Sequence, residues 1–453
     1  MADYRARGLT NGFLPEAAFL HLAPTATGYV DLDEPLAVQR PEPASWTPQC
    51  RDALLMVRLH DEPLAIIHVD GPLDRLTPKA LAAVIWHKLS DEISEHCDRV
   101  GCHDRPKEAR DLIDGLPALG GACPAARVEN ADASVTVIVP TGGRTRKLDR
   151  CLDAMSGLSF RHFEIVVVDN RPALPGTRQV VESFADRLNV RYVAEPLPGS
   201  SVARNRGIRE ATSEFVAFAD DDVVVDARWL SWLMHPFADS SVTAVSGMIL
   251  PLQLETESQK HLEQYAGFSK GVTPREYDLA DHRAHNRLLY PYWGGIFGSG
   301  ASMAFRRDDL ARNGGLDPAL GAGSLARAGA DIEVFTAAIL RGGRVVYQPR
   351  AVCWHEHTRD PTALRRQLFD YGVGLTAIFT KYLTQDARFL GAVGRSVPLA
   401  LKQRRERGAA APARLPRELA RVEHRGMLRG PWMYARSRRW ARRLKLADVL
   451  RQD

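Results

Sequence analysis

From Val135 onward, short apolar runs alternate with segments in which apolar residues recur every three or four positions. The runs VTVIV, FEIVVV, VRYV and FVAFA are apolar on both faces, which is typical of strands buried on both sides. After the first run, Leu148, Cys151, Leu152 and Met155 have the spacing of one helix face. Strands that alternate with helices in this way predict an α/β fold, in which helices cover both faces of a mostly parallel sheet.

A different pattern precedes this region. The segment ALLMVRLHDEPLAIIHVD predicts two strands joined by a turn at Asp-Glu-Pro. Thr77 and Pro78 then suit the N-cap and first turn of a helix whose apolar face runs from Leu81 to Ile93. We therefore expect a small N-terminal accessory domain of the α+β class over residues 1–125, which a loop rich in Gly, Pro and Ala separates from the α/β domain.

Length and composition are those of a soluble globular protein with more than one structural unit, since 45% of the 453 residues are hydrophobic and 25% are charged. Six cysteines occur without CxxC spacing, which argues against a zinc site or a disulfide framework and favours reduced thiols. The sequence shows neither a signal-peptide core nor an apolar stretch of membrane-spanning length. These features predict a cytoplasmic protein.

The net charge of +5 is unevenly distributed, because residues 401–453 contain 16 Lys and Arg against 5 Asp and Glu. Basic residues alternate there with apolar ones, namely Trp432, Met433, Tyr434, Trp440, Leu444 and Leu446. This composition is typical of a basic amphipathic helix that contacts an anionic membrane, with a merely solvated tail as the alternative. We expect a helical, basic region over residues 361–453, a peripheral contact with the inner face of the membrane, and no binding of nucleic acid.

The run EFVAFADDDVVVD places Asp220, Asp221 and Asp222 between two strand-like segments. Carboxylates so close together repel one another, so the run predicts either a bound cation or a solvated acidic turn. On a strand, residues i and i+2 face the same way, so Asp220 and Asp222 can converge on one ligand while Asp221 points elsewhere.

Two other predicted strands also end in polar residues. The first ends at Pro140 and Thr141, and the second ends at Asp169 and Asn170. Ligands of parallel sheets bind at the carboxyl ends of the strands, so we expect these residues and the acidic run to lie on the edge that binds a ligand.

Seven motifs in order make the pattern specific: VTVIVPTGGR, FEIVVVDN, ARNRGIREA, FVAFADDD, GSGASMAFRR, GADIEVFTAAILRGGRVVYQP and CWHEH. In order and spacing they resemble family 2 glycosyltransferases with the GT-A fold, over residues 134–360. The resemblance implies an inverting, metal-dependent enzyme that moves a sugar from a nucleotide-sugar donor to a hydroxyl group. A saccharide, a lipid-linked molecule or a small molecule would be the acceptor.

The resemblance also implies roles for individual residues. Asp222 would bind the metal, and Asp220 would contact the metal or the ribose of the donor. Oxygen ligands and a diphosphate favour Mg²⁺ or Mn²⁺. The expected donor-binding residues are Pro140, Thr141, Asp169, Arg204, Asp220 and Asp221. The family usually has a pair of acids where this chain has Asp-Asn-Arg-Pro, and an exposed helix arginine is the alternative for Arg204.

Asp331 matches the family's catalytic base, although the acid that usually precedes it is replaced by Ala330. A helix cap is the alternative role for this aspartate. His355 in WHEH matches a late histidine that binds the metal or the diphosphate, and a structural histidine is its alternative.

Two other classes of protein stay open at this point. A nucleotidyltransferase would also bind metal and nucleotide on an α/β sheet, but TGGRTR lacks the longer glycine-rich run and downstream lysine that we expect of one. A non-catalytic protein that binds nucleotide sugars or glycans is the second alternative, because the acid before Asp331 is missing.

Overall fold

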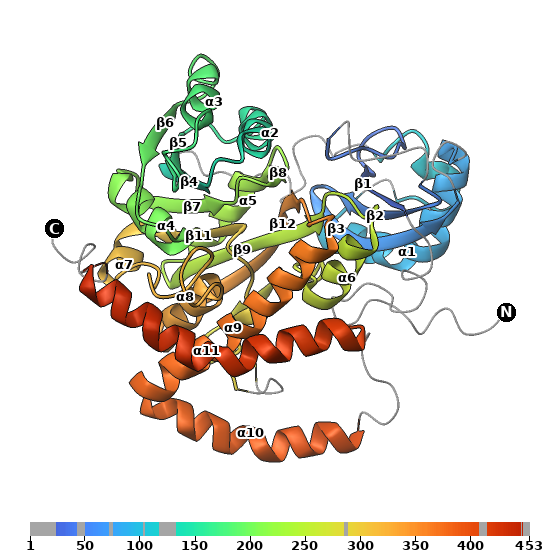
Figure 1. Ribbon diagram of the computed structural model, residues 1–453. Coiled ribbons are helices and arrows are strands. Elements are labelled where there is room, and N and C mark those ends of the chain that lie inside the picture. The colour runs from blue at the N-terminus through green and yellow to red at the C-terminus, as the bar shows by residue number, and fades with distance from the viewer. Residues whose placement is uncertain are drawn as a thin grey trace.

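The structure is a computed structural model that describes residues 24–42, 50–71, 76–102, 105–116, 133–284, 289–406, 415–444 and 446. A central sheet with its helices forms the body of the molecule (Figure 1). A small N-terminal sheet packs at one end of it, and long C-terminal helices cross beneath it in this view. The predicted boundary between the first two units falls at residues 117–132, outside the described residues.

The central sheet has nine strands in the order β10-β12-β9-β11-β7-β4-β5-β6, and β8 pairs with β12. Their bounds are Val135–Thr141 (β4), Phe163–Asp169 (β5), Val190–Ala194 (β6), Phe215–Ala219 (β7), Val223–Val225 (β8), Val242–Pro251 (β9), Arg275–Tyr277 (β10), Ser302–Arg306 (β11) and Arg344–His355 (β12). The strands β7, β4, β5 and β6 run parallel, as do β9 and β12. Antiparallel β11 joins these two groups.

Apolar side chains alternate between the two faces of the sheet, as the sequence predicts. On β4, Val135, Val137 and Val139 belong to one core and Ile138 to the other. The first core includes α2 (Thr145–Ser156), α3 (Thr177–Ser183) and α5 (Trp229–Met234). The second includes α4 (Ser200–Glu210), α7 (Arg307–Arg312) and α8 (Ala330–Leu340). Helices therefore cover both faces, and the expected α/β class is confirmed.

The N-terminal unit is a three-stranded sheet covered by one helix. Strands β1 (Thr25–Asp31) and β2 (Asp52–Leu59) are parallel, and β3 (Glu62–Asp70) pairs antiparallel with β2. Helix α1 (Pro78–Val100) begins at Thr77 as predicted, because the Thr77 hydroxyl accepts a hydrogen bond from the Ala80 amide. A 3₁₀ turn follows at Ala109–Leu112.

The predicted turn between β2 and β3 was misplaced. Its central residues are His60 and Asp61, both with positive φ (51° and 62°), whereas Glu62 and Pro63 already belong to β3. Two residues with positive φ match the twist of a tight hairpin, so the turn forms without the proline.

The N-terminal unit docks on the edge where β8 meets β12. The Arg58 guanidinium binds Asp31 within its own unit and Asp226 just after β8, both at 2.8 Å. The Thr25 amide donates to the Leu254 carbonyl at 3.0 Å, which joins the backbones of the two units. Because Arg58 and Asp226 are largely buried, these contacts fix the unit to the central sheet.

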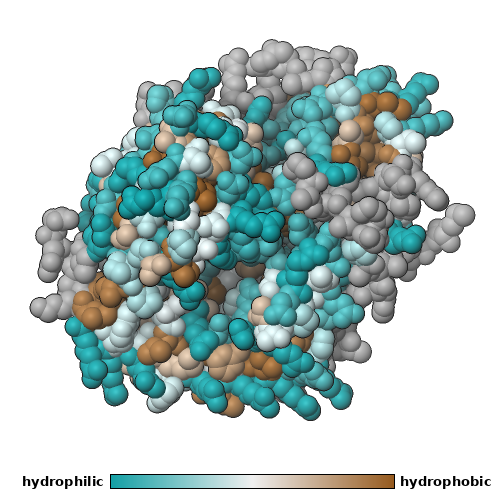
Figure 2. Space-filling view, turned by 45° about the horizontal axis from the view of Figure 1, so that its top comes forward, coloured by the Kyte–Doolittle hydropathy of each residue, from teal (hydrophilic) through white to brown (hydrophobic). Residues whose placement is uncertain are grey.

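The C-terminal region consists of α9 (Pro361–Gln385), α10 (Ala387–Glu406) and α11 (Arg417–Arg443). The remaining helical segments are α6 (Glu257–Ala266) and 3₁₀ turns at His235–Ala238 and Gly294–Ile296. None of the helices in the described part of the chain combines the length and hydrophobicity that crossing a membrane requires. On the face that Figure 2 shows, hydrophobic residues form small separate patches on a mostly hydrophilic surface.

Helix α11 buries its small and apolar face against α9 and the central domain. Tyr434 is buried, with its hydroxyl bound to Gln385, and Trp440 packs against the core. Trp432 is instead 60% exposed. The apolar residues of the tail are therefore divided between an internal and an external face, whereas the sequence pattern suggested a single membrane-facing set.

Glycines allow α9 and α11 to approach closely. A Cβ added to Gly426 would clash with the Phe369 carbonyl, and one added to Gly372 would clash with the Glu423 carbonyl. We expect Gly426→Ala to destabilise the protein by about 1–3 kcal/mol because the helix backbones must separate. Thermal unfolding measures the effect.

Gly394→Ala in α10 is the matched control, because nothing lies within 4 Å of the added Cβ. Alanine favours a helix by about 1 kcal/mol over glycine, so this variant should unfold no earlier than the wild type. Equal destabilisation of both variants would contradict the close packing of α9 on α11.

Candidate functional site

The three consecutive aspartates lie between two strands, β7 and β8, as the sequence predicted, and they form a turn in which the alternation of a strand is not imposed. Their side chains nevertheless separate as the alternation predicts. One ligand atom from each of Asp220, Asp222 and His355 lies within 4.8 Å of the others. Asp221 points elsewhere and accepts a hydrogen bond from the Thr141 hydroxyl at 2.6 Å.

Positive side chains surround Asp222, which is buried. Arg144 donates to it at 2.8 Å, while Lys147 and His355 each lie 3.4 Å from its oxygens. Burial alone would raise the pKa of this carboxyl, but His355, Arg144 and Lys147 outweigh burial and hold that pKa well below its usual range. The Asp222 carboxylate is therefore charged at neutral pH.

Asp221 is fully buried beneath the turn. Burial raises its pKa to about 6, although Arg144 and the Thr141 hydroxyl bond act in the opposite direction. A solvated acidic turn was the alternative explanation of this sequence, and the burial of Asp221 and Asp222 shows that alternative to be wrong. The protein's own cations balance part of the negative charge.

His355 reaches the acidic turn because β12 pairs antiparallel with β8, which sets His355 opposite Val223. Its Nδ1 lies 3.1 Å from Nδ1 of His357, whose Nε2 lies 2.7 Å from a carboxylate oxygen of Glu263 on α6. A carboxylate behind a histidine fixes the orientation and tautomer of the ring, so this relay supports the position of His355.

Arg204 extends from α4 to the same turn, where it donates to Asp220 at 2.5 Å. It is only 6% exposed, so the alternative of an exposed helix arginine is wrong. Gly300 passes close by, and a Cβ there would lie 3.1 Å from the Arg204 guanidinium and 3.3 Å from Cβ of Asp331. The loop around Gly300 thus joins Arg204 and the acidic turn to Asp331.

Asp331 is the second residue of α8, and Gly329 is the N-cap with φ of 90°. An Asp331 oxygen accepts the amide hydrogen of Gly300 at 2.9 Å. Asp331 therefore does not occupy the capping position, and its side chain fixes the neighbouring loop. Its role as a base stays a prediction.

At the end of β5, Asp169 lies opposite Thr141 in the parallel register, and Pro140 lies opposite Val168. The Asp169 carboxylate accepts hydrogen bonds from the Arg171 amide at 2.9 Å and from the Tyr192 hydroxyl at 3.1 Å. The edge position predicted for Pro140, Thr141 and Asp169 is therefore the observed one.

Asn170 stands where the family usually has an acid. Its amide group donates to the carbonyls of Glu195 and Leu197, and its oxygen accepts from the Gly199 amide at 2.8 Å. A carboxylate could not donate to these carbonyls, so asparagine suits the loop that leads into α4.

Four residues of the site were missed in the sequence: Arg144, Lys147, Glu263 and His357. The basic residues of TGGRTRK follow the first strand of the sheet, which is a signal that could have indicated their place near the acidic turn. Glu263 gave no such signal, because only the folded chain brings α6 to the end of β12.

A sequence model described as "Glycosyltransferase like family 2" matches residues 132–370, more than half of the chain. The chain belongs to glycosyltransferase family 2. The resemblance inferred from the seven motifs is thereby confirmed, and the matched range spans the acidic turn, Asp331 and His355.

Individual relatives of this family 2 chain are distant. The pre-mycofactocin glycosyltransferase of Mycobacterium tuberculosis is 26% identical over 227 residues, which are 49% of this chain and 43% of that protein. The validoxylamine A glucosyltransferase of Streptomyces hygroscopicus subsp. jinggangensis is 35% identical over 108 residues, 23% of this chain and 25% of that one. The matched part thus spans less than half the length of either relative.

Among solved structures, the mannosyltransferase PcManGT from Pyrobaculum calidifontis, in complex with GDP-Man and Mn²⁺, is 19% identical. The match covers 83% of this chain and 97% of that one, with a TM-score of 0.42.

Proposed function

We propose that this family 2 protein transfers a sugar from a nucleotide-sugar donor to a hydroxyl group of an acceptor, with inversion at the anomeric carbon. The observation that carries the proposal is the convergence of Asp220, Asp222 and His355 within 4.8 Å, joined through Arg204 and Gly300 to Asp331. The cluster that can bind a metal ion and a charged leaving group thus lies beside Asp331, a carboxylate that can accept a proton, at the carboxyl edge of the sheet.

The donor atoms of the acidic turn fit a divalent cation. Two carboxylates and one imidazole are ligands that Mn²⁺ accepts, and Mg²⁺ binds to the carboxylates. Asp220, Asp222 and His355 would hold the ion, which supplies a Lewis acid for the charge of the leaving diphosphate. Arg144 and Lys147, which already contact Asp222, add fixed positive charge beside it.

The transfer itself is a single displacement. The acceptor oxygen bonds to the anomeric carbon while the bond from that carbon to the diphosphate oxygen breaks, and the nucleoside diphosphate leaves with the electron pair. Asp331 takes the hydroxyl proton as the new bond forms. Its bond to the Gly300 amide holds one carboxylate oxygen in place and leaves lone pairs free for the proton.

The remaining residues of the edge bind the donor in this proposal. Thr141 and Asp169 lie side by side at the ends of β4 and β5, where the nucleoside would lie. Asp221 acts indirectly, because it is buried and holds Thr141 and Arg144. A saccharide, a lipid-linked molecule or a small molecule with a free hydroxyl group would be the acceptor.

Metal binding has one readout that needs no turnover, which is thermal unfolding. Mn²⁺ should raise the melting temperature of the wild type, because a ligand at about one hundred times its Kd adds about 2.7 kcal/mol of stability. Asp222→Asn should lose this shift together with slow metal-dependent hydrolysis of a panel of nucleotide sugars. The exposed Asp186 provides the control variant Asp186→Asn, which should keep both. An undiminished Mn²⁺ shift in Asp222→Asn would exclude the acidic turn as the metal site.

Asp331→Asn should lower the rate of transfer on the order of 10²–10⁴-fold while donor binding stays unchanged. The amide can still accept from Gly300, so the loop is retained, but it cannot take the proton. Asp309→Asn is the matched control, since Asp309 lies in the first turn of α7. Transfer within a few-fold of the wild type in Asp331→Asn would show that the residue is only structural.

The outer face of α11 supports a peripheral membrane contact. Arg436, Arg439 and Arg443 are exposed along it, and Trp432 is 60% exposed on the same helix. Spacings of three and four residues place these side chains on one face, opposite the face that packs on α9. Cationic and apolar groups together suit the interface of an anionic leaflet.

Arg436→Gln combined with Arg439→Gln should weaken sedimentation with anionic vesicles, because each arginine near such a surface contributes about 1 kcal/mol. High salt should release the wild type as well. Arg161→Gln combined with Arg187→Gln removes the same charge near α2 and α3, at the opposite end of the molecule (Figure 1). The contact is refuted if both double variants sediment like the wild type.

A further inference from the structure

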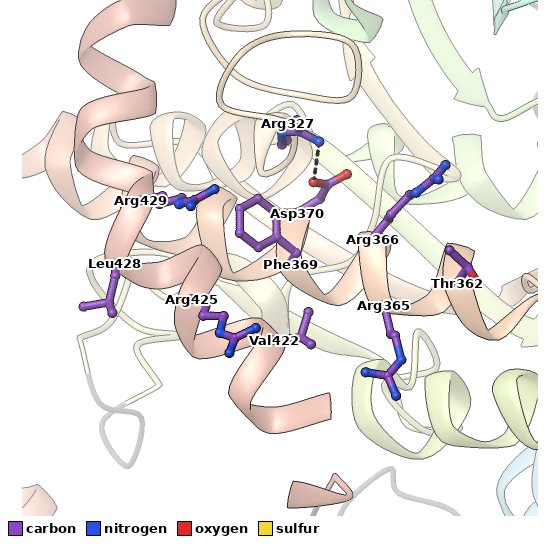
Figure 3. A pocket seen from close by; sticks show the side chains of 10 residues that line it. All are labelled: Arg327, Thr362, Arg365, Arg366, Phe369, Asp370, Val422, Arg425, Leu428 and Arg429. Atoms are coloured by element: carbon purple, nitrogen blue, oxygen red, sulfur yellow. Dashed lines mark hydrogen bonds and ion pairs between the residues drawn. The ribbon is translucent and has the colours of Figure 1, made fainter. Parts of the chain in front are cut away.

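A cavity of about 730 Å³ opens between α9 and α11, outside the site described above. Arg327 lines it from the loop before α8, Arg366 and Phe369 from α9, and Arg425 and Arg429 from α11. Figure 3 shows Phe369 near the centre, with the arginines arranged around it. The cavity is thus lined by one aromatic ring and by several guanidinium groups.

The cavity carries an excess of positive charge. Five arginines line it against one acid, Asp370, which pairs with Arg327 at 3.0 Å. Arg365 pairs with Glu418 at 2.8 Å. The other three arginines have no carboxylate partner within the described part of the chain. Guanidinium groups present paired donors that match the oxygens of a phosphate, so an anion of this kind would complete the cavity.

Apolar side chains also line the cavity, beside the arginines. The guanidinium carbons of Arg327 and Arg429 lie 5.7 Å and 5.9 Å from the centre of the Phe369 ring, so two cations contact this ring. Val422 and Leu428 line the cavity on the α11 side, and Leu428 is 83% exposed. An inorganic anion would leave this surface in contact with water, whereas an apolar chain attached to the phosphate would cover it.

The cavity is connected to the candidate site through the loop that precedes α8. Arg327 lies four residues before Asp331, with a positive φ of 66°. The Arg327 guanidinium pairs with Asp370 of α9 at 3.0 Å, and a Cβ at Gly329 would lie 2.7 Å from Cδ1 of Ile378 on the same helix. The loop that precedes α8 therefore contacts α9 and leads directly to Asp331.

We propose that this cavity binds the phosphate or diphosphate group of an amphiphile, with Arg366, Arg425 and Arg429 around the phosphate and the apolar chain on Phe369 and Leu428. A phospholipid of the membrane and a free phosphorylated acceptor share this chemistry. The site does not depend on the roles assigned to Asp222 and Asp331.

Dioctanoyl phosphatidic acid, used below its micelle concentration, is the soluble probe. Calorimetric titration of the full chain should detect binding, and Arg366→Gln combined with Arg425→Gln should weaken it about tenfold or more through loss of two charged hydrogen bonds. Arg161→Gln combined with Arg187→Gln removes the same charge outside the cavity and should bind like the wild type. Unfolding curves of both double variants report whether the fold is retained.

Three comparison ligands complete the test. Inorganic pyrophosphate and dioctanoyl phosphatidylcholine should both bind more weakly than phosphatidic acid, since the first lacks the chain and the second has a shielded phosphate. A single-stranded oligonucleotide that competes with phosphatidic acid at equal strength would overturn the proposal in favour of a nucleic-acid site. If pyrophosphate binds as tightly as phosphatidic acid, the ligand is not an amphiphile and the proposal is overturned.

Vesicles of phosphatidylcholine with one part in five of phosphatidic acid distinguish a membrane lipid from a free phosphorylated molecule as the ligand. If the cavity variant loses both soluble and vesicle binding, the ligand is a membrane lipid. Loss of soluble binding alone identifies a free phosphorylated molecule as the ligand. Unchanged binding of the soluble probe in the cavity variant refutes the site.

Discussion

Burial of two carboxylates, Asp221 and Asp222, beside the part-exposed Asp220 is the constraint on which the candidate site depends. Isolated buried charges cost several kcal/mol each, so the turn after β7 is stable only where the fold supplies compensating groups. Thr141 and Arg144 come from the end of β4 and the start of α2, Arg204 comes from α4, and His355 comes from β12. The sheet order brings these elements to one edge, and the charge balance of the turn therefore depends on the whole α/β domain.

Local patterns predicted the elements well because they depend on nearby residues. The alternation along β4 and β5, the face of α2 and the start of α1 at Thr77 all follow from short-range periodicity and capping. The convergence of Asp220 and Asp222 was predicted from the alternation of a strand, and their ligand atoms do lie close together although the run forms a turn.

Contacts between segments far apart in the chain could not be predicted from the sequence. The β8–β12 ladder sets His355 opposite Val223, and no local pattern encodes that register. The contact of Glu263 with His357 likewise exists only once α6 reaches the end of β12. Composition also could not tell which partner covers an apolar helix face. Tyr434 on α11 is buried inside the molecule, although the tail's pattern alone is equally typical of a helix on a membrane.

The Arg58 bridge has a consequence for how the chain could change in evolution. Its guanidinium lies between Asp31 of the N-terminal unit and Asp226, four residues after the metal-site candidate Asp222. A lineage that lost or exchanged the N-terminal unit would remove the counter-charge of Asp226 and uncover the chain directly behind the turn. The two units look modular along the sequence, but their shared ion triplet requires them to be inherited together.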